Sequence, residues 1–271
     1  MDRSRLQSKF AATLGLLSAL TLQAAAAECP RTDALGTSRV LAVDAAATPR
    51  VGQVSFPETL DLQDREIVLT FDDGPAPDND EKILAALAEE CVRATFFLIG
   101  KQASKNPEWV RKIAAAGHTV AHHGWSHHKL SVMSPEDVRD DIDKGIAAVE
   151  MALNGVSTTT ASTPFFRYPY FEMSKDSLDY LEHRGMVVFG ADLVAHDWVR
   201  MTPEQQLEKM IAGFNDTKKG IFLLHDAAAQ TAVALPAFLR YLRDNGYRVV
   251  HVVPAAPGKA AADLRRSEKR E

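Results

Sequence analysis

The sequence has few of the features that mark membrane-embedded, nucleic-acid-binding or disulfide-rich proteins. Its 271 residues include only two cysteines, which excludes a small disulfide-rich scaffold. The formal net charge is −5 and basic residues form no long run, so nucleic acid is not the expected partner. The apolar stretch from Phe10 to Leu22 is shorter than the roughly 20 residues that span a bilayer. What remains is ordinary globular composition, with 46% hydrophobic and 25% charged residues.

The N-terminus has the pattern of a targeting segment. Arg3, Arg5 and Lys9 precede the apolar stretch, and the small residues 24–27 follow it. This order predicts a signal peptide over residues 1–27, and therefore a periplasmic or secreted protein without a stable membrane span in its mature form. An uncleaved membrane anchor is the alternative interpretation.

Export would place the two cysteines in an oxidising compartment, where a disulfide can form. Cys29 and Cys91 allow a single intramolecular pairing. That pairing would join an N-terminal arm to the end of the first long helix. The alternative is two separate thiols, one of them buried.

Apolar strand patterns alternate with helical patterns along most of the chain. The sequence predicts an extended, irregular arm over residues 28–63 and a disordered tail over residues 254–271. Between them, residues 64–253 predict a single catalytic domain with a parallel sheet, either a doubly wound open sheet or a distorted barrel. The predicted strands span 66–71, 94–100, 119–123, 165–170, 187–193, 220–226 and 247–253, and the predicted helices 79–90, 107–116, 134–153, 175–184, 202–214 and 231–245.

Polar residues collect at the ends of the predicted strands, where parallel α/β folds place their chemistry. Two adjacent acids at the end of an apolar strand repel each other, so a metal ion or an arginine nearby is expected to neutralise them. The residues found at these ends are Asp72 and Asp73, His122, His123 and His127, Arg167 and Tyr170, Asp197 and Trp198, and His225.

His123 and His127 are spaced four apart, which on a helical turn would place both imidazoles on one face. Two histidines and a carboxylate from another strand end form a catalytic type of zinc site, because an open position remains for water. The same ligands also accept Co²⁺ or Mn²⁺. His122 could replace His123, but its spacing of five to His127 suits one face less well.

A metal site of this kind predicts hydrolysis. One aspartate can bind the metal ion while its neighbour acts as the general base, and His225 can act as the acid if Asp197 holds its imidazolium. Arg167 can fix the base aspartate and keep it ionised. The plain alternative for Arg167 is an ordinary salt bridge.

Taken together, these motifs resemble those of the polysaccharide deacetylases, carbohydrate esterase family four, whose prototype is the nodulation-type chitooligosaccharide deacetylase. The resemblance covers about residues 64–253 and agrees in motif order and spacing. Its motifs are Thr70-Phe71-Asp72-Asp73-Gly74-Pro75, His123-Gly124-Trp125-Ser126-His127, Arg167-Tyr168-Pro169-Tyr170, Asp197-Trp198 and Leu223-Leu224-His225. Val194 departs from the family pattern, because many relatives carry an aspartate at that position.

The resemblance implies a distorted (β/α)7 barrel and a metal-dependent hydrolase that removes N-acetyl groups from N-acetylglucosamine units of a glycan. It implies that Asp72 is the base, oriented by Arg167, and that Asp73, His123 and His127 bind the metal, most simply Zn²⁺. His225 would be the acid, tuned by Asp197. The backbone N–H of Tyr170 would stabilise the oxyanion, and Trp198 and Leu223 would line the acetyl groove. Alternatives are an O-acetyl esterase acting on xylan-type glycans and a catalytically inert glycan-binding envelope protein.

Overall fold

The computed structural model describes residues 29, 31–214 and 217–256 of the chain. The predicted signal segment, and the predicted tail beyond residue 256, lie outside the described residues. Within the described part, no helix is long and apolar enough to cross a membrane.

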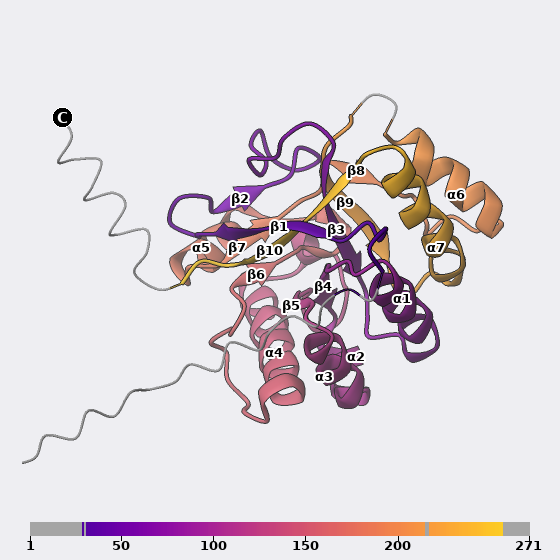
Figure 1. Cartoon of the computed structure of the whole chain (residues 1–271). Helices are drawn as coiled ribbons and strands as arrows, with labels where there is room; N and C mark the ends of the chain where they lie inside the picture. Colours follow the sequence, from indigo (N-terminus) through magenta and orange to yellow (C-terminus); the bar gives the residue numbers. More distant parts are fainter. Residues whose placement is uncertain (1–28, 30, 215–216, 257–271) are drawn as a thin grey trace, which may run out of the picture.

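A parallel sheet occupies the centre of the molecule (Figure 1). Within the described residues the sheet contains ten strands, and all their pairings are parallel. The strands follow the order β1-β10-β3-β4-β5-β6-β7-β2, while β9 pairs with both β3 and β8. Their bounds are β1 Thr37–Val43, β2 Arg50–Val51, β3 Glu66–Asp72, β4 Thr95–Leu98, β5 Thr119–His122, β6 Phe165–Phe166, β7 Val187–Phe189, β8 Leu193–Val194, β9 Gly220–His225 and β10 Arg248–Pro254.

Helices lie around the outside of this sheet (Figure 1). Most of them begin with an N-cap residue or with a proline in the first turn. Ser134 and Thr202, for example, each accept a hydrogen bond from a backbone N–H of the helix that follows. The helices are α1 Pro77–Glu89, α2 Gly100–Lys105, α3 Pro107–Ala115, α4 Pro135–Asn154, α5 Lys175–His183, α6 Pro203–Ala212 and α7 Ala229–Asp244, with 3-10 turns at η1 Leu130–Val132 and η2 Pro169–Phe171.

Successive residues of β3 point into two different parts of the core. Ile67, Leu69 and Phe71 pack against buried residues of α1 and α7. Val68 points to the other side, into a cluster of buried residues that come only from strands and from the N-terminal arm, and to which Phe97 and Val250 also belong. A core built from strands and the arm, rather than from helices, is the interior of a sheet curled on itself. The α/β class is therefore confirmed, and the barrel-like arrangement agrees with the predicted distorted barrel.

The prediction of an irregular arm over residues 28–63 was wrong in one respect, because the arm contributes two strands. β1 pairs with β10 over Thr37 to Val43, and β2 pairs with β7. Only alternate residues of β1 are shielded from solvent, and its sequence, Thr-Ser-Arg-Val-Leu-Ala-Val, is apolar only over residues 40–43. A one-sided strand beside prolines and glycines is hard to separate from extended loop.

The predicted strand 94–100 is shorter in the structure because α2 begins at Gly100. The Gly100 N–H donates to the carbonyl of Gly124 at 2.8 Å. A β-carbon at Gly100 would lie 2.7 Å from the Cα of Gly145 on α4. The close approach of α2 and α4 therefore requires glycine and turns the chain away from the sheet.

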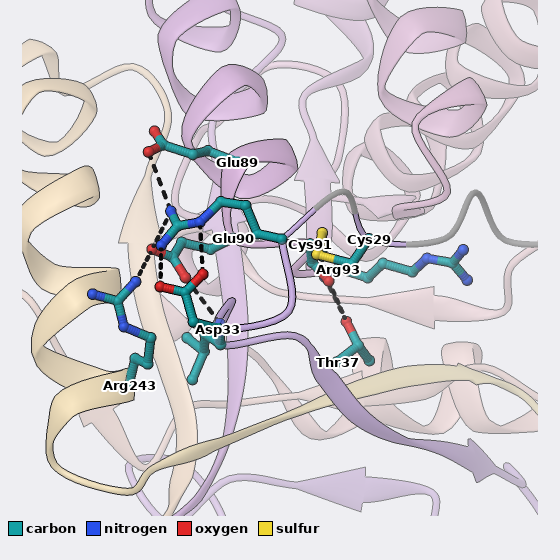
Figure 2. The surroundings of a disulfide bond; sticks show 10 residues. Cys29, Asp33, Thr37, Glu89, Glu90, Cys91, Arg93 and Arg243 are labelled. Atoms are coloured by element: carbon teal, nitrogen blue, oxygen red, sulfur yellow. Dashed lines mark hydrogen bonds and ion pairs between the residues drawn. A yellow bond between two sulfur atoms is a disulfide. The ribbon is translucent and has the colours of Figure 1, made fainter.

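A disulfide joins Cys29 to Cys91, which lies just after α1, and the pairing agrees with the one predicted (Figure 2). The two residues are 62 positions apart, with their Cα atoms 5.6 Å from each other. Beside it, the buried carboxylate of Glu90 accepts from Arg243 Nη1 at 2.8 Å. The bond therefore ties the start of the described arm to the end of α1.

Candidate active site

The carboxyl ends of β3, β5 and β9 form one edge of the barrel. β3 pairs with β4 on one side and with β9 on the other, and β4 pairs in turn with β5. Asp72 at the end of β3 lies in register with His225 at the end of β9. Because the strands are parallel, residues that follow them collect at this edge, and the polar residues of the sequence motifs meet there.

Asp73, His123 and His127 come together at this edge. Each offers one ligand atom, and the three atoms lie within 4.8 Å of one another. Asp73 Oδ1 is 3.0 Å from His127 Nε2 and 3.4 Å from His123 Nε2. Donors bound tetrahedrally to one ion at about 2.0–2.1 Å would be separated by roughly 3.3 Å, so the observed spacing suits a single cation.

The hydrogen bonds around these residues leave their lone pairs free. His123 Nδ1 donates to the carbonyl of Arg167 at 2.7 Å, so Nε2 of the neutral ring carries the lone pair. Asp73 Oδ1 is buried and has no hydrogen-bond partner among the described residues. Burial alone would raise the pKa of Asp73, but His123 and His127 lower it below its ordinary value. A buried, ionised oxygen that faces the Nε2 atoms of two imidazoles fits a divalent cation.

The segment His123 to His127 is a loop, so the predicted helical turn was wrong. Gly124 and His127 have φ angles of 70° and 58°, which a helix does not contain. Asp141 on α4 holds the loop: its carboxylate accepts from the backbone N–H of Trp125 at 2.8 Å and of Ser126 at 3.1 Å.

Asp141 was not among the predicted site residues, although the sequence carried a signal for it. It lies within the apolar stripe of α4, beside the buried residues Val138 and Ile142. A charged residue in such a stripe needs a specific partner, and here the partner is the histidine loop.

Asp72 forms a buried ion pair with Arg167. Oδ1 of Asp72 accepts from Arg167 Nη1 at 2.7 Å, and both side chains are almost fully buried. Arg167 also donates to Thr70 Oγ1 at 2.8 Å and to the carbonyl of Gly190 at 2.7 Å. Oδ2 of Asp72 lies 3.8 Å from His123 Nε2. The arginine therefore fixes one carboxylate oxygen and leaves the other beside the candidate metal ligands.

His122, the alternative ligand, lies elsewhere. Its Nε2 is 3.8 Å from Oε1 of the buried Glu150, and it is not part of the ligand cluster. Burial lowers the pKa of His122 to about 4, with Glu150 opposing the shift. Of the two adjacent histidines, His123 is the one that faces Asp73.

His225 is held by Asp197. Nδ1 of His225 lies 2.6 Å from Asp197 Oδ1, and the backbone N–H of His225 donates to Oδ2 at 2.8 Å. Thr231 also donates to Oδ2, at 2.5 Å. Burial alone would lower the pKa of His225, but Asp197 more than offsets this and raises it to about 9. With Nδ1 engaged, Nε2 is the ring nitrogen available for proton transfer. Thr231 gave no signal in the sequence, because its role depends on the fold bringing α7 to the end of β9.

Gly74 in the Asp-Asp-Gly-Pro turn is required by a close approach. A β-carbon there would lie 1.8 Å from Oδ2 of Asp226, which is fully buried. The backbone N–H of Asp226 donates to the carbonyl of Asp72 at 3.2 Å. The turn that carries Asp72 and Asp73 is thus packed directly against the end of β9.

A cleft of about 320 Å³ opens beside these residues. Asp73, Trp198, Arg200 and His225 are among its lining residues. The ring of Trp198 is exposed and meets His225 edge-on, with centroids 5.7 Å apart.

Two further predicted residues lie outside the lining of this cleft. Tyr170 is also exposed, and its ring centroid lies 4.6 Å from that of His127. Leu223 is buried on β9, two residues before His225. The structure therefore brings Trp198 to the cleft wall, Tyr170 to the rim beside His127, and Leu223 into the core below His225.

Comparison with known proteins gave matches over most of the described chain. A family model described as polysaccharide deacetylase matches residues 60–189. The chain is 31% identical over 194 residues to a chitooligosaccharide deacetylase of Sinorhizobium fredii, covering 67% of this chain and 87% of that protein. It is also 31% identical over 188 residues to the Listeria monocytogenes peptidoglycan-N-acetylglucosamine deacetylase PgdA, covering 69% of this chain but only 38% of that protein.

Among solved structures, the chain is similar to the Bdellovibrio bacteriovorus peptidoglycan deacetylase Bd3279. The TM-score is 0.73 at 30% identity, over 84% of this chain and 62% of the other. The similarity reaches beyond the region matched by the family model and includes more of the barrel.

Proposed function

The chain belongs to the polysaccharide deacetylase family of enzymes, and from this premise we propose that it removes N-acetyl groups from N-acetylglucosamine units of a glycan, releasing acetate. Chitooligosaccharide and peptidoglycan, on which the named relatives act, are the substrates we propose. The observation that carries the proposal is one barrel edge that holds three converging ligand atoms, a buried Asp-Arg pair and a His-Asp pair.

Asp73, His123 and His127 would hold the metal ion, which we propose to be Zn²⁺, with Co²⁺ or Mn²⁺ as substitutes. When bound, the ion would polarise the scissile carbonyl and lower the pKa of a water molecule toward about 7. The rest of the reaction depends on the side chains around it.

Asp72 is proposed to take a proton from the attacking water through Oδ2, the oxygen that Arg167 does not engage. The backbone N–H of Tyr170 is proposed to donate to the developing oxyanion. Tyr170 has a φ angle of 58°, unusual for a residue other than glycine, and its placement at the rim supports that role.

His225 is proposed to donate the Nε2 proton to the departing amine nitrogen, while Asp197 stabilises the imidazolium. The exposed rings of Trp198 and Tyr170 give a sugar ring apolar surfaces at the rim. The disulfide supports a proposed location outside the cytoplasm, in the periplasm or secreted.

Acetate release tests the function directly. The purified protein is incubated with N-acetylated chitooligosaccharides, with peptidoglycan and with O-acetylated xylan, before and after metal chelation. We expect acetate and free amines from the N-acetylated glycans, loss of both on chelation, and recovery on addition of Zn²⁺. Acetate from xylan alone would favour the esterase alternative. No release from any substrate by metal-loaded protein would favour the inert glycan-binding protein.

The His225–Asp197 pair predicts a specific pH dependence. A protonated acid with a pKa of about 9 remains active through neutral pH, and kcat/KM falls as pH rises through that value. Removing the carboxylate charge in Asp197→Asn leaves burial to lower the pKa of His225. We therefore expect the alkaline limb of kcat/KM to move to lower pH by more than one unit.

The same pair is linked to stability. Because its folded-state pKa is raised, His225 stabilises the fold below its ordinary pKa of 6.5, and this stabilisation is lost as pH rises through about 9.

The exposed Asp140 on α4 provides the control for the kinetic prediction: Asp140→Asn should leave the pH profile of kcat/KM unchanged. An unchanged alkaline limb in Asp197→Asn would contradict the role of Asp197.

A further inference from the structure

A second pocket, of about 430 Å³, shares no lining residue with the cleft at the catalytic edge. It is lined by Thr119 and Val120 at the start of β5, by His251 and Val253 on β10, and by Arg93 just before β4. β10 pairs with the first residues of β3. Thr119 Oγ1 donates to the carbonyl of Val252 on β10 at 2.7 Å. The pocket therefore opens at the amino ends of β4 and β5, whereas the candidate ligand His123 follows the carboxyl end of β5.

His118 presents a hydrogen-bond donor in this pocket. Its Nδ1 accepts the backbone N–H of Ala94 at 3.1 Å, so in the neutral ring the proton is on Nε2. Burial lowers the pKa of His118 to about 3, with smaller contributions from His251 and Arg93. At neutral pH the ring is therefore an uncharged donor through Nε2.

His251 presents an acceptor. Thr119 has one hydroxyl proton, which it gives to Val252, so the 2.8 Å contact with His251 Nε2 requires the imidazole to donate. Nδ1 then carries a lone pair, and this nitrogen is buried without a hydrogen-bond partner among the described residues. The side chain is 4% exposed, and burial lowers its pKa to about 4. A buried acceptor without a donor indicates a missing partner.

Arg93 gives the pocket its charge. Its side chain extends away from Glu89 and Glu90, on the far side of the disulfide (Figure 2). Among the described residues that line the pocket there is no carboxylate, and those contributed by α3 and α4, Ala114 and Leu153, are apolar. Its positive charge contributes to the lowered pKa values of both histidines. The pocket therefore combines a cation with a neutral donor and a neutral acceptor.

We propose that this pocket binds hydrogen phosphate, either free or as the terminal group of a phosphomonoester. The oxyanion would accept from Arg93 and from His118 Nε2, and its remaining P–OH would donate to His251 Nδ1. All three groups are then satisfied without protonating a buried histidine. Sulfate has no proton to donate near neutral pH and would leave His251 Nδ1 unpaired. The site does not depend on the proposed deacetylase function.

Isothermal titration calorimetry tests the proposal on the full chain. The Asp73→Ala variant is used in a chelating buffer, so that phosphate cannot bind a metal ion at the other end of the barrel. At pH 6, where roughly half of a phosphomonoester keeps its proton, we expect saturable binding of inorganic phosphate or of glycerol 2-phosphate. Sulfate should bind at least 10-fold more weakly. Binding of inorganic phosphate alone would assign a site for the free ion, and preference for the monoester would assign the terminal group.

Variants locate the binding. Arg93→Gln removes a charge-assisted hydrogen bond and should weaken phosphate binding by about 10- to 100-fold. Arg240→Gln, at an exposed position on α7, should bind like the parent. If Arg93→Gln is poorly folded, long-range ¹H–¹⁵N spectra of the Asp73→Ala chain locate the binding instead. Phosphate should shift the ring signals of His118 and His251 and leave those of His123 and His127 unchanged. Absence of binding, equal affinity for sulfate or unshifted rings would overturn the proposal.

Discussion

Asp73→Ala is expected to abolish metal binding and turnover together. Asp73 Oδ1 is the only carboxylate oxygen in the described ligand cluster, and it lies 3.0 and 3.4 Å from the two histidine nitrogens. Two neutral imidazoles alone provide no negative charge to offset a divalent cation. Since losing a residue that merely orients a ligand costs 10- to 100-fold, we expect activity to fall by at least about 100-fold. Metal content by mass spectrometry and acetate release provide the two measurements.

The comparison variant is Asp140→Ala, which removes a carboxylate from an exposed position of α4 without touching the barrel edge. It should retain full metal occupancy and activity. Metal occupancy near one ion per chain in Asp73→Ala would show that Asp73 is not a ligand. Loss of activity with the metal retained would instead assign it a role in the reaction itself.

The sequence was most informative where strands are buried on both faces. β3 is buried along its whole length, so its residues 67–71 are apolar except for Thr70, and the two acids at its end, Asp72 and Asp73, are conspicuous. β9 similarly leads from buried apolar residues to His225. Because parallel strands end at one edge, strand assignments alone were enough to predict that these polar residues meet.

Features that depend on tertiary contacts could not be predicted from local sequence patterns. The loop from His123 to His127 is shaped by Asp141, which follows it by more than a dozen residues and reaches it only when α4 packs beside β5. Strand β8 is likewise separated from β7 by residues 190–192, and the carbonyl of Gly190 in this gap accepts from Arg167. Local propensity predicts one continuous strand there, and the tertiary contact divides it.

The Asp72–Arg167 pair leads to the second large effect, which separates the general base from the metal ligands. In Asp72→Asn, the neutral amide cannot accept a proton from water, while Asp73, His123 and His127 are unaltered. We expect metal content to remain at the parental level and kcat to fall by about 100-fold or more. Turnover near the parental rate would remove Asp72 as the base, and loss of metal would make it a ligand.

The same substitution leaves the guanidinium of Arg167 buried without its carboxylate, and breaking a buried pair from one side costs about 3–5 kcal/mol. Thermal unfolding must therefore be measured beside activity. Glu66→Gln is the matched control: Glu66 is buried at the other end of β3 and accepts from Arg39 Nη2 at 2.7 Å. Loss of the Glu66 charge should lower the melting temperature but leave kcat unchanged, because Glu66 lies away from the catalytic edge. If both variants lost activity in proportion to stability, the effect of Asp72 would be structural; a fall in kcat confined to Asp72→Asn would assign it to proton transfer.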